Sequence, residues 1–234
     1  MKRMAAVMGA LLAVSAAACS GSTSTSTPSP SIGTSSAPVS RAPSSSAAGG
    51  TAGAPAGARV LGQPRVGEPF TLTITYSNGA PPTLLRVTVD SVTCNGLDPQ
   101  VLAYAANSTG ASTTPTPAPE AGKKYCVLAM TATNVGTEKA TWSANDTVAL
   151  NVGGVHYQQT QDDAAHALDY EQYWHSKGQT GPIFGINPNS TGPVHGVFQI
   201  PTSDTPTSVW VSSGTAIRTI NGIQPGYLVN LAAS

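Results

Sequence analysis

The stretch KKYCVLAMTATN, Lys123–Asn134, decides the fold of this chain of 234 residues. Alternate side chains of a β-strand point to opposite faces, and here both faces carry apolar groups: Tyr125, Val127 and Ala129 on one, and Cys126, Leu128 and Met130 on the other. A strand that is apolar on both faces is typical of the interior of a sheet that is covered on both sides. We therefore expect Lys123–Asn134 to be a central strand.

Two runs upstream alternate apolar and polar residues and predict half-buried antiparallel strands. Phe70–Tyr76 alternates apolar side chains with threonine and precedes the turn-prone Asn78–Gly79. The second run begins at Leu85, and its alternation changes phase at Asp90 before it resumes at Val92. An extra residue in one strand of an antiparallel pair causes such a shift, so we predict a β-bulge near Asp90.

Downstream runs predict further short strands joined by turns. They are Val148–Val152, Val155–Tyr157 after a Gly153–Gly154 turn, Val194–Ile200, Val209–Val211 and Tyr227–Leu231. Only 9% of the residues are charged, and Gly, Pro, Ser and Thr are abundant, which favours strands and turns over helices. About eight strands separated by turns predict an all-β fold, an immunoglobulin-like antiparallel β-sandwich.

The N-terminus carries the parts of an export signal. Basic Lys2–Arg3 precedes the apolar run Met4–Val14 and small residues that end at Cys19. The run is too short to stay in a bilayer as a spanning helix, so residues 1–18 are expected to be a cleaved signal peptide.

The cleavage region resembles a lipobox, in which a cysteine receives diacylglycerol and becomes the mature N-terminus. Ala17, Ala18 and Cys19 fit that pattern, whereas Ala16 stands where leucine is usual. The three alanines also fit ordinary signal cleavage, which would yield a secreted protein. An exported chain with three cysteines can pair Cys94 with Cys126 and leave Cys19 for lipidation, although two buried free thiols on neighbouring strands are the alternative.

The segment 19–57 that follows is expected to be a disordered, lipid-anchored linker. Ser and Thr account for 17 of the 38 residues from Ser20 to Gly57, and Arg41 is the one charged residue there. Such a composition buries too little apolar area to offset the entropy of ordering. The folded domain is therefore expected to span residues 58–234.

Parts of the expected sandwich resemble the telokin-like, immunoprotective-antigen type of immunoglobulin-like domain found in Gram-positive lipoproteins. The resemblance rests on Gly122–Tyr125, which opens a long strand, Thr133–Glu138, which closes it, and Asn187–Ser190, which leads into Gly196–Pro201. It covers roughly Leu61–Ser213, and it implies a fold, not a chemistry.

Charge and motifs restrict the function. The formal net charge is zero and the basic residues are scattered, so we expect no nucleic-acid partner. The sequence has no G-x-S-x-G motif and no glycine-rich phosphate loop, which argues against an enzyme and against a cofactor. The cluster of titratable residues at 162–175 keeps an alternative open, since Asp162, His166 and Asp169 at helical spacing could bind a divalent metal. That alternative is a metal-dependent hydrolase or metal-binding protein. The competing interpretation of the same segment is a solvated acidic turn that binds no metal.

These observations favour a non-enzymatic, monomeric binding module at the cell surface. The expected location is the extracytoplasmic face of the cell membrane, held by lipid on Cys19, with secretion as the alternative. The expected partner is an envelope protein or a wall polymer. Asn107–Gly122 and Gln161–Gln179 are the candidate contact loops, because loops on a rigid scaffold often carry function.

The anchor is testable by changing Cys19 to serine. Acylated protein is expected to partition into the detergent phase of a membrane extract, because two acyl chains give lasting membrane attachment. The Cys19→Ser variant should be released to the medium. Mass spectrometry that finds an unmodified Cys19 at the mature N-terminus of the wild-type protein would contradict the lipobox interpretation.

Overall fold

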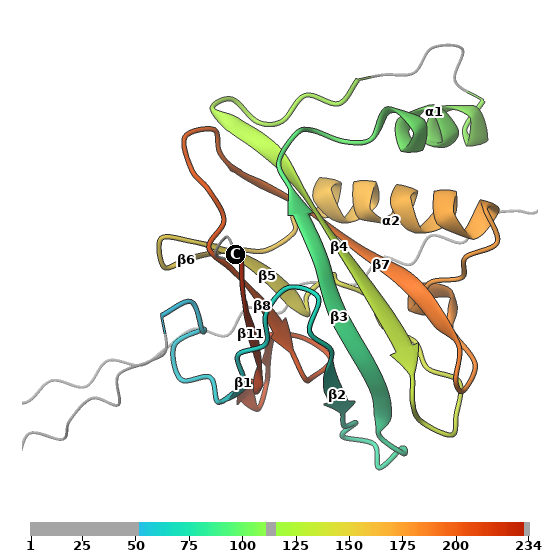
Figure 1. The fold of residues 1–234 in the computed structure, drawn as a ribbon, viewed down its shortest axis with the longest axis vertical. Helices are drawn as coiled ribbons and strands as arrows, with labels where there is room; N and C mark the ends of the chain where they lie inside the picture. Colours follow the sequence, from blue (N-terminus) through green and yellow to red (C-terminus); the bar gives the residue numbers. More distant parts are fainter. Residues whose placement is uncertain (1–51, 111–115, 232–234) are drawn as a thin grey trace, which may run out of the picture. The chain divides into compact units, whose positions relative to one another are not determined.

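The computed structural model describes residues 52–110 and 116–231, so Cys19 and nearly all of segment 19–57 lie outside the described residues. Two sheets form a β-sandwich (Figure 1), which confirms the predicted all-β fold class. The strands are β1 (Val60–Gly62), β2 (Phe70–Ile74), β3 (Thr83–Thr93), β4 (Lys123–Asn134), β5 (Val148–Val152), β6 (Val155–Tyr157), β7 (Thr191–Pro201), β8 (Ser208–Ser212), β9 (Arg218–Thr219), β10 (Gly222–Ile223) and β11 (Gly226–Asn230).

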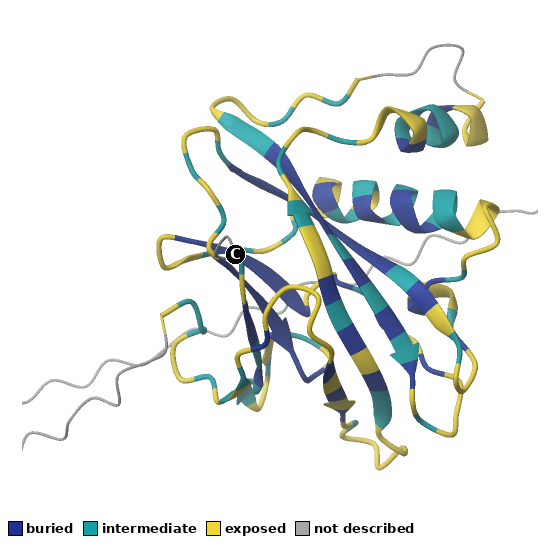
Figure 2. Ribbon diagram, in the orientation of Figure 1, coloured by how far each residue is buried: buried dark blue, intermediate teal, exposed yellow. Residues whose placement is uncertain are grey.

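Strand β4 is central, as predicted, in a four-stranded sheet of order β2-β3-β4-β7. It pairs antiparallel with β3 on one side and with β7 on the other, from Lys123 opposite Pro201 to Thr133 opposite Thr191. Figure 2 shows exposed residues along β3, whereas β4 has none. The apolar pattern on both faces of β4 therefore reflects cover on both sides of the sheet.

Two local predictions about the strands are confirmed. The register between β3 and β4 shifts between Val89 and Ser91, which places the bulge at Asp90. Gly153 and Gly154 join β5 to β6, and both have positive φ angles of 54° and 88°. Glycine adopts such angles without steric cost, so this pair makes the tight hairpin possible.

The five-stranded sheet has the order β1-β11-β8-β5-β6. The C-terminal segment enters it as β11, which pairs antiparallel with β8 and parallel with β1. The sequence analysis did not predict β1, β9 or β10, which have only three, two and two residues. Strands β9 and β10 form a separate two-stranded sheet.

The main core lies between the two sheets. Leu72, Leu85 and Leu128 from the four-stranded sheet pack in one cluster with Leu150 and Val209 from the five-stranded sheet. All five side chains are fully buried. Burial of each such side chain contributes about 1.5–3 kcal/mol, so this interface is a main source of the domain's stability.

Two helices cover the outer face of the four-stranded sheet (Figure 1): α1 (Pro99–Ser108) and α2 (Gln161–Ser176). Residues of both helices form a second cluster with β4 and β7, made of Val101, Tyr125, Val127, Ala167, Tyr170 and Val197. Helix α2 begins with a capping box, in which Thr160 and Asp163 exchange side-chain to backbone hydrogen bonds. The sandwich thus has a third layer on one side.

Helix α1 is a correction to the sequence analysis, which placed a Thr/Pro-rich loop over Asn107–Gly122. The helix begins at Pro99 and includes Asn107. Asp98 is its N-cap residue, and Oδ1 of Asp98 accepts a hydrogen bond from the N–H of Gln100 over 2.8 Å. Asp at the N-cap followed by Pro is a strong helix start, and this signal was overlooked. Residues 111–115 of the predicted loop lie outside the described residues.

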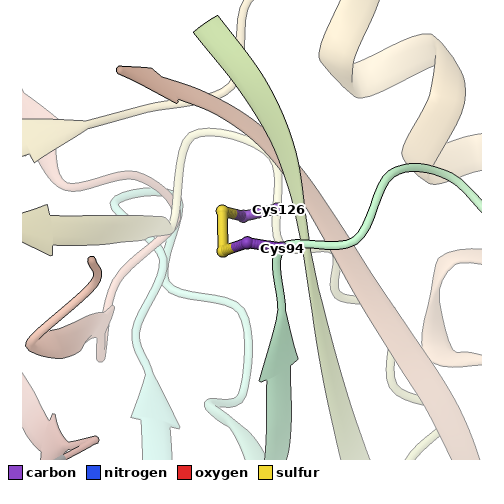
Figure 3. The surroundings of a disulfide bond; sticks show 2 residues. All are labelled: Cys94 and Cys126. Carbon is purple, nitrogen blue, oxygen red and sulfur yellow. A yellow bond between two sulfur atoms is a disulfide. The ribbon is translucent and has the colours of Figure 1, made fainter. Parts of the chain in front are cut away.

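The structure joins Cys94 to Cys126 by a disulfide, and their Cα atoms are 4.0 Å apart (Figure 3). Thr93, the last residue of β3, pairs with Val127 of β4. The next residue, Cys94, therefore lies opposite Cys126 of β4. Cys126 is fully buried in the main core, against which Cys94 packs. The predicted disulfide is therefore present.

The packed region extends upstream of residue 58. The side-chain amide of Asn151 donates to the backbone oxygen of Gly53 over 2.7 Å, and Ala54 packs against a third small core cluster that includes Trp210. No helix in the described part of the chain is both long and apolar enough to cross a membrane.

Removing the disulfide with the double variant Cys94→Ala/Cys126→Ala is expected to lower the free energy of unfolding by about 3–4 kcal/mol. The physical reason is the extra freedom of an unfolded chain whose 32-residue loop is no longer closed. Urea unfolding measures the loss. Reductant should destabilise the wild type and leave the stability of the double variant unchanged. If the wild type and the double variant are equally stable without reductant, the prediction is contradicted.

Candidate functional site

Strand β7 ends the four-stranded sheet, and side chains close its free edge in place of another strand. The backbone N–H of His195 donates to Oε1 of Glu171 on α2 over 2.6 Å. The N–H of Val197 donates to Oε1 of Gln159, just before α2, over 3.0 Å. These bonds satisfy donors that an open edge would present to other chains.

Two prolines protect the same edge. Pro193 and Pro201 are in the same alternation as His195 and Val197, and alternate residues of an antiparallel strand direct their backbone groups to the same side. Because proline has no N–H, neither residue adds an unpaired donor. From Pro193 to Val197 the edge of β7 is thus closed by sequence choices as well as by side chains from α2 and its N-terminal flank.

Glu171 and His195 form a buried polar pair. Oε1 of Glu171 lies 3.0 Å from Nδ1 of His195, and the two side chains are only 5% and 8% exposed. The rings of Tyr170 and Trp174 lie beside the imidazole, with centroids at 5.1 and 6.5 Å. Gly181 approaches Oε2 of Glu171 so closely that a Cβ atom there would collide with it. The pair is therefore held from three segments of the chain.

A cavity of about 210 Å³, which we call the edge cavity, lies beside this pair. It is bounded by residues 142–145, by one face of α2, by Ile183 and by Val194 and His195 of β7. Three residues that line it have a buried polar atom without a hydrogen-bond partner: Nε1 of Trp142, Nε2 of Gln159 and Oε2 of Glu171. Each such group costs about 1–3 kcal/mol when it stays unpaired.

A larger hollow of about 660 Å³, which we call the polar groove, lies along the first residues of β7. Its polar side chains are those of Thr131, Gln179, Thr180, Asn187, Ser190 and Thr191. Glycines also line it, and among the described residues at its wall none is ionisable. The groove therefore offers hydroxyl, amide and backbone groups without a charge.

The predicted titratable segment is helix α2. Nδ1 of His166 lies 3.5 Å from Oδ2 of Asp169, so these two residues share a face as expected. Asp163 is buried and accepts a hydrogen bond from Nε2 of Gln199 over 2.8 Å, which gives it a structural role. In residues 52–110 and 116–231, no three His, Cys, Asp or Glu side chains are grouped to hold a metal ion, and Asp162 does not complete such a group.

The aromatic residues of α2 pack within the domain. Tyr170 is buried, and its hydroxyl accepts a hydrogen bond from the N–H of Asp98 over 2.7 Å. Burial raises the pKa of Tyr170, so its hydroxyl stays protonated at neutral pH. The hydroxyl of Tyr173 donates to Gln100 of α1 over 2.8 Å. Most of Gln161–Gln179 is consequently a packed helix, and Gln179 lies just beyond its end.

The sequence analysis did not join Glu171 to His195, which lie 24 residues apart. Glu171 fell within the titratable segment 162–175, and His195 was given no role. One signal was available, because His195 stands inside the apolar run Val194–Ile200. A polar side chain at such a position requires a buried partner.

Comparison with known proteins gives no family. No protein-family model matches the chain, and the search of curated proteins finds no relative. The solved structures include two similar chains. One is a conserved hypothetical protein from Bacillus anthracis, with 16% identity over 61% of this chain and 89% of that chain, and a TM-score of 0.37. The other is an uncharacterized β-sandwich protein from Clostridium difficile, with 14% identity over 74% of this chain and 95% of that chain, and a TM-score of 0.37.

Replacing Glu171 by alanine is expected to lower the free energy of unfolding by about 1–3 kcal/mol relative to Glu171→Gln. Alanine leaves the N–H of His195 without its acceptor, whereas glutamine keeps a side-chain oxygen at the same position. Urea unfolding of both variants measures the difference. Two variants of equal stability would show that the bond does not stabilise the edge of β7.

Proposed function

We propose that the chain is a lipoprotein of the cell envelope whose sandwich domain is a non-enzymatic binding module. The pattern that ends at Cys19 supports a lipid anchor, and the Ser/Thr/Pro-rich composition of segment 19–57 supports a flexible spacer. The telokin-like resemblance supports the same setting, since such domains occur in Gram-positive lipoproteins. In this arrangement the domain reaches from the membrane into the wall.

The polar groove is the observation that carries the binding role. Its wall presents hydroxyl and amide side chains and no ionisable group among the described lining residues. General acid–base catalysis needs a titratable side chain at the reacting atoms, so such a wall favours binding over reaction. A neutral, hydroxyl-rich and amide-rich ligand complements it, and a wall glycan has this chemistry. We therefore assign a wall polymer as the partner.

Two groove side chains are suited to contact a ligand. Gln179 and Asn187 are both exposed, which leaves their amide groups accessible to a polymer. Each hydrogen bond to a ligand contributes about 0.5–1.5 kcal/mol, and 1.4 kcal/mol is a tenfold change in affinity. The double variant Gln179→Ala/Asn187→Ala is thus expected to weaken binding about tenfold.

Sedimentation of the purified full chain with protein-free peptidoglycan measures this affinity. The matched control is Asn95→Ala/Gln158→Ala, which removes two amide side chains at exposed positions outside the groove and should bind like the wild type. A wild-type protein that does not sediment with the polymer would contradict the proposal. Cross-linking from residue 187 to an envelope protein would then indicate a protein partner.

A further inference from the structure

We propose that the polar groove is the neutral part of a longer binding surface, and that Arg86 and Lys139 beside it bind carboxylates that branch from the same wall polymer. Such a surface deepens the function proposed above and depends on it, because the groove takes the sugar chain while the two cations take its charged branches. The ligand is thereby narrowed from any neutral glycan to a glycan with carboxylate-bearing branches.

The outer face of the four-stranded sheet is only partly covered. Residues of α1 and α2 pack on it around Tyr125, Val127 and Val197. On β2 and β3, the residues that alternate with the buried core residues point to this face, and Figure 2 shows exposed residues on both strands. Thr71 and Arg86 are two of these exposed residues. Arg86 therefore lies on a solvent-facing part of the face that carries the helices.

A row of directly opposed residues crosses all four strands of this face. Thr71 of β2 lies opposite Arg86 of β3, and Arg86 lies opposite Thr133 of β4. Thr133 in turn lies opposite Thr191 of β7, and the hydroxyl oxygens of these two threonines are 2.8 Å apart. Because Thr191 lines the polar groove, the row leads from the groove to Arg86.

Arg86 is close enough to the groove for one ligand to contact both. Thr88 on the same strand lies opposite Thr131, which lines the groove, so Arg86 is a diagonal neighbour of Thr131. Diagonal neighbours on an antiparallel sheet are about 7–8 Å apart, a separation that a long side chain spans. The guanidinium of Arg86 is therefore within reach of a ligand that occupies the groove.

Lys139 brings a second cation to the groove. Its side chain packs against Gly185, which lines the groove, so closely that a Cβ atom at position 185 would collide with Cε of Lys139. Lys139 and Arg86 are both exposed, and within residues 52–110 and 116–231 neither forms a salt bridge. Both cations are therefore available to an anionic ligand.

The acidic residues near this surface do not neutralise its cations. Asp90 accepts a hydrogen bond from the hydroxyl of Thr131 over 2.7 Å. It lies four residues from Arg86 along β3, which is about 13 Å in an extended strand. Glu138 is exposed next to Lys139 and forms no salt bridge with the residues that the structure describes. The surface thus keeps a positive charge on either side of the groove residues Thr131 and Gly185.

These features define the ligand. The groove wall offers hydroxyl and amide groups without a charge, so it suits a sugar chain and not the charged groups of a polymer. Arginine binds a carboxylate through two parallel N–H···O hydrogen bonds, and lysine binds one as a point charge. A polymer that occupies both parts needs an uncharged sugar chain with carboxylates on short branches. Peptidoglycan has this chemistry, because its peptide branches carry free carboxylates.

Sedimentation of the purified full chain with native and with amidated peptidoglycan tests this surface. Carbodiimide and excess methylamine convert the branch carboxylates into neutral amides and leave the sugar hydroxyls unchanged. An exposed ion pair contributes up to about a fivefold change in affinity, so amidation should weaken wild-type binding about fivefold or more. High concentrations of sodium chloride should also weaken binding to the native polymer, because salt screens exposed charges.

Three variants identify the residues that bind the carboxylates. Arg86→Gln and Lys139→Gln should each weaken binding to native peptidoglycan about fivefold, and neither should change binding to the amidated polymer. Arg59→Gln serves as the control, because it removes the same charge at an exposed position just before β1 of the other sheet, and it should bind like the wild type. All three side chains are exposed, so the variants should keep the fold.

The outcomes separate this proposal from that of the groove. Equal wild-type binding to native and amidated polymer, or a loss in Arg59→Gln as large as in Arg86→Gln, would overturn the carboxylate site and leave the groove in place. If Gln179→Ala/Asn187→Ala binds like the wild type while Arg86→Gln and Lys139→Gln bind weakly, the groove proposal fails and the carboxylate site stands. A wild-type protein that sediments with neither polymer contradicts both.

Discussion

The free edge of β7 must find hydrogen-bond partners, and the rest of the outer layer depends on how it does so. Glu171 and Gln159 supply two acceptors, and the prolines in the same alternation remove two donors. An open edge would be a template for pairing with other chains. Because an acceptor comes from α2, the helix is fixed beside the edge as well as on the face of the sheet.

This position of α2 explains both the core pattern and the location of the edge cavity. Helix α2 covers the outer faces of β4 and β7 together with α1, so β4 is apolar on both sides. Where the helix passes the edge of β7, the space between them is not completely filled, and the edge cavity lies there. A helix that packed only on the face of the sheet would not close the edge of β7, and it would not form this cavity.

The parts of the fold that adjacent residues encode could be predicted from the sequence. Contacts between residues far apart in the sequence could not. The two apolar faces of Lys123–Asn134, the phase change at Asp90 and the Gly153–Gly154 turn are each encoded in adjacent residues, and all three predictions hold. Helix α1 was missed although Asp98 and Pro99 mark its start in adjacent residues. Glu171 meets His195 only because α2 packs beside β7, which no local pattern encodes.

The central claim is that side chains from α2 and its N-terminal flank close the edge of β7, and amide hydrogen exchange at His195 and Val197 tests it most directly. A closed edge predicts that both N–H groups exchange as slowly as the β7 amides that pair with β4, because they are hydrogen bonded in a buried setting. It also predicts that Glu171→Ala speeds exchange at His195 much more than at Val197. Fast exchange at both amides in the wild-type protein would contradict the account.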